Sequence, residues 1–359
     1  LLGISCAASF FATMSYTPRP AEETSPSPRN YWPLWCWMAG FAAIWCLAVW
    51  RNPSWLRLDD SWRLQLAVIT RGWFGAIAPV GTGTLILPVM VSGGEFSPHA
   101  FRTLCFLIQA VALTSGTLYV LCRRLTVDWA LASCTILGCA LGTPLGLRLI
   151  APHISSAAVV AVYAIVWGSF GLAALLWLRD HPPLSFPPPP PRRILRYAAF
   201  ASGIIGGGAI SSILGAGSCL PFYAMLVFLR RLDIRGAAAT CTVVSAANSF
   251  IGAGSLMAQG EIEPAAFHLW LPAAPIACLT IPLAWILLNR IKPYMTLLLA
   301  GTYCVLQAAW LILQFRSEWP AVGLVYIAAA LAYGLFMYRI LHLIGMAMAR
   351  STSTMQGAS

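Results

Sequence analysis

Two short glycine turns are the places in this sequence with the chemistry to bind a small ion. The runs Gly-Thr-Gly-Thr at 81–84 and Gly-Ala-Gly-Ser at 215–218 each lie near the middle of a long apolar segment and precede a proline. Glycine and proline interrupt a helix, and the freed main-chain N–H groups attract an anion at the start of the next half-helix. Alternatively, these glycines only let helices approach closely. The turn residues assigned to the predicted site are Gly81, Thr82, Gly83, Thr84, Gly215, Gly217 and Ser218.

The placement of charged side chains also favours an anion. All eleven Asp and Glu lie in loops or at the ends of apolar segments, whereas a cation path would present an acidic side chain inside the bundle. Arg102 lies one turn inside its apolar segment, where it either pairs with an oxyanion or extends to the membrane surface. For Arg71 and Arg148 we favour the membrane surface. Asn248, in the middle of a segment, either lines the path or hydrogen-bonds a neighbouring helix.

The sequence contains no pattern typical of a catalytic or metal site. The five histidines are isolated, no H-E-x-x-H motif is present, and the eleven cysteines form neither a C-x-x-C pair nor a zinc spacing. We therefore predict that the protein is not an enzyme and binds no metal or cofactor. An intramembrane enzyme and a non-transporting scaffold are the alternatives to a transporter, the scaffold being suggested by the prolines at 187–191.

The composition is that of a membrane protein. Only 9% of the 359 residues are charged, 59% are hydrophobic, and the mean hydropathy is +0.76, whereas a soluble domain needs roughly 25% charged residues. Apolar runs of about 20 residues, which cross a hydrocarbon core of roughly 30 Å as a helix, recur along the chain. The formal charge of +11 lies mostly in short loops. That charge sets membrane orientation, so we expect a lipid bilayer and no nucleic acid as partner.

The apolar segments divide the chain into two halves joined by a proline-rich linker, in which the prolines at 187–191 form a stiff spacer. The segments fall at about 31–50, 65–91, 99–121, 127–150, 155–178, 197–229, 237–258, 265–288, 294–314 and 320–345. The predicted units are N-terminal helices and a loop at 1–64, a first repeat at 65–178, the linker at 179–196, a second repeat at 197–315, and a C-terminal helix and tail at 316–359.

Three pairs of matching motifs indicate that the halves arose by duplication. The glycine turns form one pair, and Ala-x-x-Thr at 100–103 and 237–240 forms another. Thr-Pro-Leu-Gly at 143–146 matches Ile-Pro-Leu-Ala at 281–284, and the three offsets of 134, 137 and 138 residues keep the order. We predict an all-α polytopic membrane protein of two inverted repeats. Each repeat is a broken or re-entrant helical hairpin plus three transmembrane helices, and extra helices flank the repeats.

Loop charges test this orientation. If 65–91 and 197–229 dip into the membrane and return, one side carries 15 of the 20 loop Lys and Arg, as the positive-inside rule requires. Equivalent loops also differ in charge, because 92–98 holds no Lys or Arg and 230–236 holds three. Letting 65–91 cross gives 16 to 4, so charge leaves the first hairpin open and only the duplication favours it.

Together these motifs resemble the TauE/SafE sulfite exporter family of bacterial membrane proteins. The resemblance rests on the two glycine turns, the two Ala-x-x-Thr motifs and the glycine-rich run at 138–146, and it covers roughly 65–315. This chain departs from the family because it has Gly-Thr-Gly and Gly-Ala-Gly where three consecutive glycines are usual. The resemblance implies export of sulfite, an organosulfonate or a similar small oxyanion across the cell membrane. Uptake of a related organic anion is the alternative. The sequence does not indicate which oligomeric state the protein has.

Overall fold

The computed structural model describes residues 30–56, 62–77, 83–92, 97–180, 192–230, 232–288, 290–291 and 293–314, and singly 332, 335 and 339. In this part of the chain the regular structure is helical, and eight helices are long and apolar enough to cross a membrane. The prediction of an all-α polytopic membrane protein is confirmed. Residues 1–29, the linker prolines and nearly all of the predicted helix at 320–345 lie outside the described residues.

The helices follow the predicted apolar segments closely. They are α2 (Trp32–Arg51), α3 (Trp62–Ile77), α4 (Gly83–Ser92), α5 (Pro98–Cys122), α6 (Trp129–Leu149), α7 (Ser156–Asp180), α8 (Arg192–Ile205), η3 (Gly206–Ser211), α9 (Ser212–Leu214), α10 (Leu220–Ala224), η4 (Met225–Leu229), α11 (Ile234–Gln259), α12 (Pro264–Leu288) and α13 (Pro293–Gln314), with short 3-10 turns η1 (Pro53–Trp55) and η2 (Ala151–His153). The largest difference is at α8, which begins at Arg192 inside the stretch expected to be linker, whereas the segment was expected to begin at 197. Arginine is a good helix former and Leu195 is buried, so residues 192–196 join the helix.

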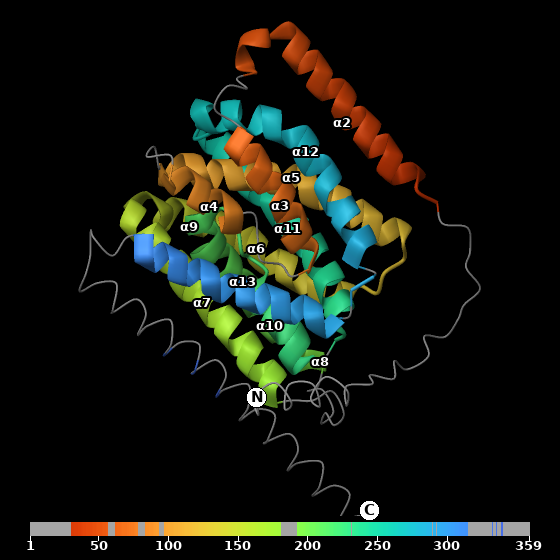
Figure 1. Ribbon diagram of the computed structural model, residues 1–359, viewed down its shortest axis with the longest axis vertical. Coiled ribbons are helices and arrows are strands. Elements are labelled where there is room, and N and C mark those ends of the chain that lie inside the picture. The colour runs from red at the N-terminus through yellow and green to blue at the C-terminus, as the bar shows by residue number, and fades with distance from the viewer. Residues whose placement is uncertain are drawn as a thin grey trace, which may run out of the picture.

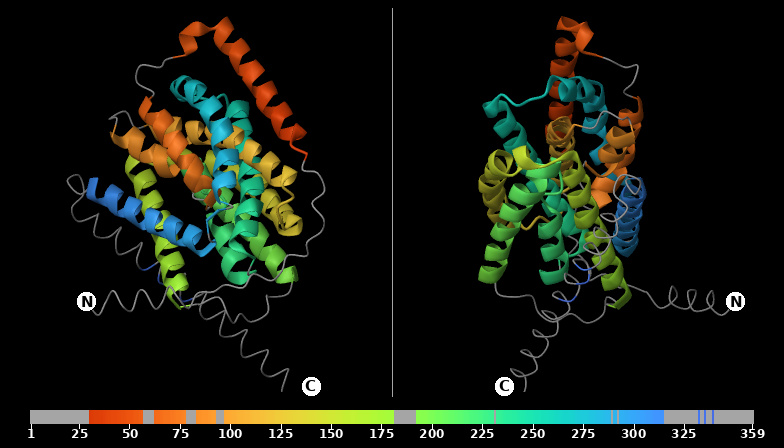
Figure 2. Two further views of the ribbon diagram at one scale, coloured as in Figure 1. Left: turned by 45° about the vertical axis from the view of Figure 1, so that its right-hand side comes forward. Right: turned by 90° about the vertical axis from the view of Figure 1, so that its left-hand side faces the viewer.

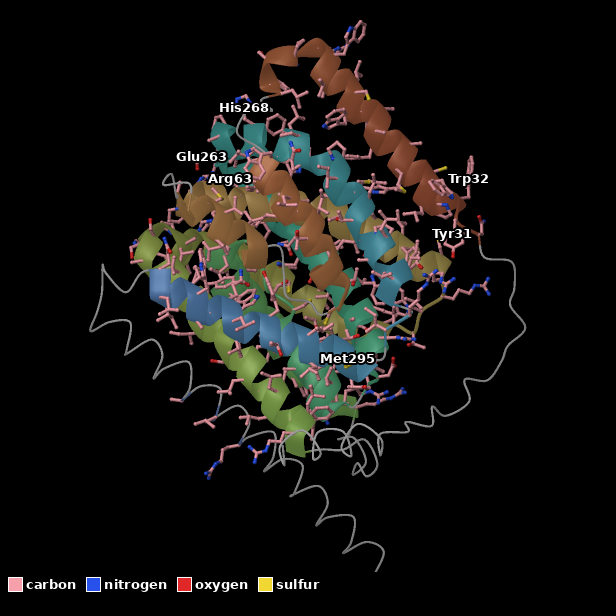
Figure 3. All side chains as sticks on the ribbon, in the orientation of Figure 1. Tyr31, Trp32, Arg63, Glu263, His268 and Met295 are labelled. Carbon is pink, nitrogen blue, oxygen red and sulfur yellow. The ribbon has the colours of Figure 1, made fainter. Side chains whose placement is uncertain are left out.

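We call the two ends of the bundle the basic end and the acidic end. Arg192 at the start of α8 and Arg230 just after η4 line one pocket, which marks the basic end. His99 Nδ1, near the start of α5, lies 3.2 Å from Oε2 of Glu263, which marks the acidic end. Figure 3 shows Glu263 and Met295 toward opposite ends of the bundle. The chain from α8 to η4 therefore enters the bundle and returns at the same end.

The long helices pack in pairs that join the two halves of the sequence. α5 contacts α11 and α12, α6 contacts α8 and α11, α3 contacts α12, and α7 contacts α13. Figure 1 shows α13 lying across α7, and α12 alongside α5. The core therefore depends on contacts between residues far apart in the sequence.

A line of glycines lets α6 and the chain of α8 and η3 approach closely. Gly138, Gly142 and Gly146 recur every four residues on one face of α6, and a Cβ at each would collide with the main chain of α8 or η3. At Gly142 the added atom would lie 2.6 Å from the carbonyl oxygen of Ile204. Small residues at this spacing are typical of close helix packing in membranes.

The helix α2 lies along the outside of the bundle (Figures 1 and 2) and is attached by polar contacts. The indole N–H of Trp45 donates to the carbonyl of Leu271 at 2.7 Å. That carbonyl has no helical donor, because residue 275, four positions later, is a proline. The indole N–H of Trp37 donates to the hydroxyl of Ser115 at 3.0 Å.

Candidate functional site

The candidate site surrounds the break in the second hairpin. After η3, which is π-helical, α9 ends at Leu214 and the chain turns through 215–219 before α10 begins. Gly215 and Gly217 have φ angles of +65° and +82°, in the left-handed region that glycine adopts without strain. The helix therefore breaks at the glycine turn, as the sequence predicts. A π-helical stretch beside a break is a feature that recurs at functional sites.

Arg102 reaches this break from the second turn of α5. Its side chain is 6% exposed, and its Nη1 donates to the carbonyl of Ser212 at 3.0 Å. Its Nε has no hydrogen-bond partner among the described residues. Arg102 is thus buried at the break and does not extend to the membrane surface.

Carbonyl groups released by the break are bound by side chains of α5. Gln109 Nε2 donates to the carbonyl of Gly215 at 2.7 Å and to that of Cys105 at 3.2 Å. A helix end leaves carbonyls without partners, and Arg102 and Gln109 supply donors for two of them. Side chains from the first half of the chain therefore hold the broken helical hairpin of the second half in place.

Asn248 connects three elements beneath the break. Its Oδ1 accepts from the hydroxyl of Thr143 on α6 at 2.6 Å, and its Nδ2 donates to the hydroxyl of Ser211 in η3 at 2.9 Å. All three side chains are buried. These are hydrogen bonds between neighbouring helical elements, as one of the two interpretations of Asn248 expects.

Gly217 and Ser218 pack tightly against their surroundings. A Cβ at Gly217 would collide with the outer atoms of the Trp167 indole, and a Cβ at Gly206 would collide with the carbonyl of Ser218. Trp167 itself stacks on Tyr163 with ring centroids 4.5 Å apart. The turn is therefore enclosed by an aromatic wall from α7 and by the glycines of η3.

Three main-chain N–H groups of the turn lack a main-chain acceptor among the described residues. Of the main-chain hydrogen bonds found outside helices in the described part of the chain, none is donated by Ala216, Gly217 or Ser218. Gly215 differs, since its N–H donates to the carbonyl of Ser211 at 2.7 Å. These three N–H groups lie on the turn that Arg102 contacts, because a Cβ at Gly215 would also meet the main chain of Arg102.

The structure brings together only part of the predicted site. Arg102, Asn248 and the three assigned residues of the second turn all lie at this break. Gly81 and Thr82 lie outside the described residues, while Gly83 and Thr84 form the start of α4. Five further residues at the break were not assigned to the site from the sequence: Gln109, Thr143, Trp167, Ser211 and Ser212. Thr143, Ser211 and Ser212 could have been found from their position in, or just before, a glycine motif that repeats between the halves.

A helical bundle with eight candidate membrane spans among its described residues is that of a polytopic membrane protein. The chain belongs to the sulfite exporter TauE/SafE family, whose model matches residues 64–311. The resemblance in the motifs is thereby confirmed, and this family consists of transporters and not enzymes. Comparisons with curated proteins and with solved structures returned no match.

Proposed function

We propose that this protein exports a small oxyanion, sulfite or an organosulfonate, and binds it where the two hairpins break. The observation that carries this proposal is the buried guanidinium of Arg102, whose one hydrogen-bond acceptor among the described residues is a main-chain carbonyl. A positive charge inside a membrane span is costly and marks a functional site. Its unbonded Nε and the free N–H groups of the turn are donors suited to an oxyanion. The proposed binding residues are Gly81, Thr82, Gly83, Thr84, Arg102, Gly215, Gly217, Ser218 and Asn248.

The proposed architecture is a pair of inverted repeats, α3 to α7 and α8 to α13. A twofold axis in the membrane plane would exchange α3 with α8, α5 with α11, α6 with α12 and α7 with α13. The observed contacts fall into the sets that such an axis relates: α3 with α12 matches α8 with α6, and α5 with α12 matches α11 with α6. The chain just before α3 also supports the inversion, because the Trp55 carbonyl lies 3.2 Å from Nδ1 of His268, near the start of α12. This contact is near the acidic end, whereas α8 begins at the basic end.

The orientation in the cell membrane follows from loop charge. The positive-inside rule places the basic end in the cytoplasm, so the first hairpin enters from outside and the second from inside. An anion leaving a cell with an inside-negative potential moves downhill, by about 2.3 kcal/mol per charge per 100 mV, or about fiftyfold in concentration. Export therefore needs only a selective gated path, and we propose that no ion is obligatorily coupled to it.

The experiment is sulfite flux in proteoliposomes under a clamped potential, with pH and Na⁺ equal on both sides. Wild-type flux should follow the potential. Arg102→Gln should raise the sulfite concentration that gives half-maximal flux by about tenfold to a hundredfold. A hydrogen bond to a charged group contributes about 1.5–3 kcal/mol to binding. Arg148→Gln is the matched control, since that arginine is exposed in the same kind of segment.

Three outcomes would count against the proposal. Flux that ignores the potential and follows an imposed proton or Na⁺ gradient would indicate coupled uptake of a related anion. Equal flux through the Arg102 and Arg148 variants would show that Arg102 does not bind the substrate and only stabilises the end of α9. No flux of sulfite or of any sulfonate through well-folded wild-type protein would refute the substrate class.

A further inference from the structure

A second basic site lies at the basic end of the bundle, between the starts of α6 and α8. It is a cavity of about 330 Å³, within the range of small-ligand pockets, about 300–1,000 Å³. Arg192, Arg196 and Arg230 line it together with Asp128 and Trp129. Arg192 and Arg196 are four residues apart on α8, so they lie on the same face of that helix.

The charges in this cavity are unbalanced. Asp128 is already engaged, because its Oδ2 lies 3.4 Å from Nε of Arg230 and its Oδ1 accepts from the N–H of Leu131 at 3.3 Å. No ion pair found among the described residues includes Arg192 or Arg196. Within the described part of the chain, these two guanidinium groups in one cavity have no anionic partner. Planar guanidinium groups bind phosphate in bidentate geometry.

The cavity lies at the level of lipid headgroups. It is formed by the first residues of two candidate membrane spans, which begin at Trp129 and Arg192. The side chains of Trp129 and Tyr197 are more than half exposed beside it, and aromatic residues concentrate where a membrane meets water. A ligand entering from the plane of the membrane would reach the arginines without crossing the protein.

An apolar surface runs from the cavity along the membrane span. Leu137, Leu141, Leu145 and Leu149 recur every four residues on α6, and all four are more than half exposed. Ile194, at the first turn of α8, is exposed as well. The cavity is thus charged at the level of the headgroups and continuous with an apolar strip where acyl chains lie.

We propose that this cavity binds the phosphate of an anionic phospholipid headgroup, with Arg192 and Arg196 as its ligands. The acyl chains lie against the leucine strip of α6. Free phosphate shares the headgroup chemistry, but it would gain nothing from the apolar strip, which is why we assign the site to a lipid. Arg230 positions the cavity wall through Asp128 and the start of α6. The site is independent of the oxyanion site at the hairpin break.

The test measures lipid-dependent stability of the purified full-length protein in neutral detergent micelles. Phosphatidylglycerol, phosphatidylcholine and inorganic phosphate are titrated separately, and the midpoint of thermal unfolding is followed. The Arg192→Gln/Arg196→Gln variant should need about thirtyfold more phosphatidylglycerol for the same shift, from about fivefold per arginine. Arg193→Gln is the matched control, because Arg193 does not line the cavity and its guanidinium lies over the Tyr197 ring.

Each outcome decides the proposal. A phosphatidylglycerol shift that the double variant weakens and Arg193→Gln preserves supports a headgroup site. Equal shifts from phosphatidylglycerol and phosphatidylcholine, or equal loss in the Arg193 variant, would show general surface attraction and overturn it. Protection by inorganic phosphate as strong as that by phosphatidylglycerol would reassign the cavity to free anions. If the double variant is poorly folded, Leu141→Ser distinguishes a bound lipid from free phosphate. It should weaken protection by phosphatidylglycerol and leave any protection by inorganic phosphate unchanged.

Discussion

Replacing Gly217 with alanine tests whether the hairpin break has the geometry described. The substitution forces an L-residue into φ +82°, which costs about 1–2 kcal/mol. It also places a Cβ against the outer atoms of the Trp167 indole, which is fully buried and cannot move freely. Overpacking of a core costs typically about 1–3 kcal/mol. The expected loss in the free energy of unfolding is therefore about 2–5 kcal/mol.

Two other glycines separate these contributions. Gly260 has φ +70° with open space around its added Cβ, so Gly260→Ala should lose only the backbone part, about 1–2 kcal/mol. Gly254 is helical and equally open, so Gly254→Ala should be stabilising by up to about 1 kcal/mol. The difference between Gly217→Ala and Gly260→Ala isolates the collision with the indole.

The assay is equilibrium unfolding in mixed micelles, followed by tryptophan fluorescence and circular dichroism. A double variant, Gly217→Ala with Trp167→Phe, removes the indole atoms nearest the Cβ and should recover at least about 1 kcal/mol relative to the sum of the single losses. Equal unfolding free energies for Gly217→Ala and Gly260→Ala would refute the close approach of Trp167. Additive losses in the double variant would refute it independently.

Three further predictions concern the polar contacts and the arrangement of the bundle. Asn248→Ala should destabilise the protein by about 1–3 kcal/mol, because two buried hydroxyls lose their partner; the same micelle unfolding measures it. Trp45→Phe should loosen α2 by about 0.6–2 kcal/mol, seen as faster proteolysis near α2, whereas the exposed Trp50→Phe should not. Single cysteines at Glu261 and Arg290 should react with an impermeant reagent from opposite sides of the membrane, and labelling of both from one side would contradict the arrangement of α12.

The membrane spans and the position of the break could be predicted from the sequence because both are local signals. A run of about 20 apolar residues fixes a span by its length, and glycines with positive φ fix the turn at 215–217. Arg192 and Arg230, which the loop charges assign to one side of the membrane, line the same pocket. The inverted repeat and the roles assigned to the site residues remain predictions.

The partners of the site residues could not be predicted, because they depend on packing between distant helices. The sequence allows two interpretations of Asn248. Only the packing of α6 and η3 shows that Asn248 forms hydrogen bonds with Thr143 and Ser211. Arg102 is likewise held inside by a carbonyl of α9, 110 residues away. The π-helical form of η3 had no local signal beyond its three consecutive glycines.

The packing of α3 on α12 has a consequence for how the protein is made. About 190 residues separate the end of α3 at Ile77 from the start of α12 at Pro264. At roughly 5–20 residues per second, the ribosome needs about 10 to 40 s to synthesise that stretch. During this time the first hairpin resides in the bilayer beside lipid or the insertion machinery, because the helix that will cover it has not yet been translated. Any factor that assists the insertion of this chain would have to protect α3 until translation is almost complete.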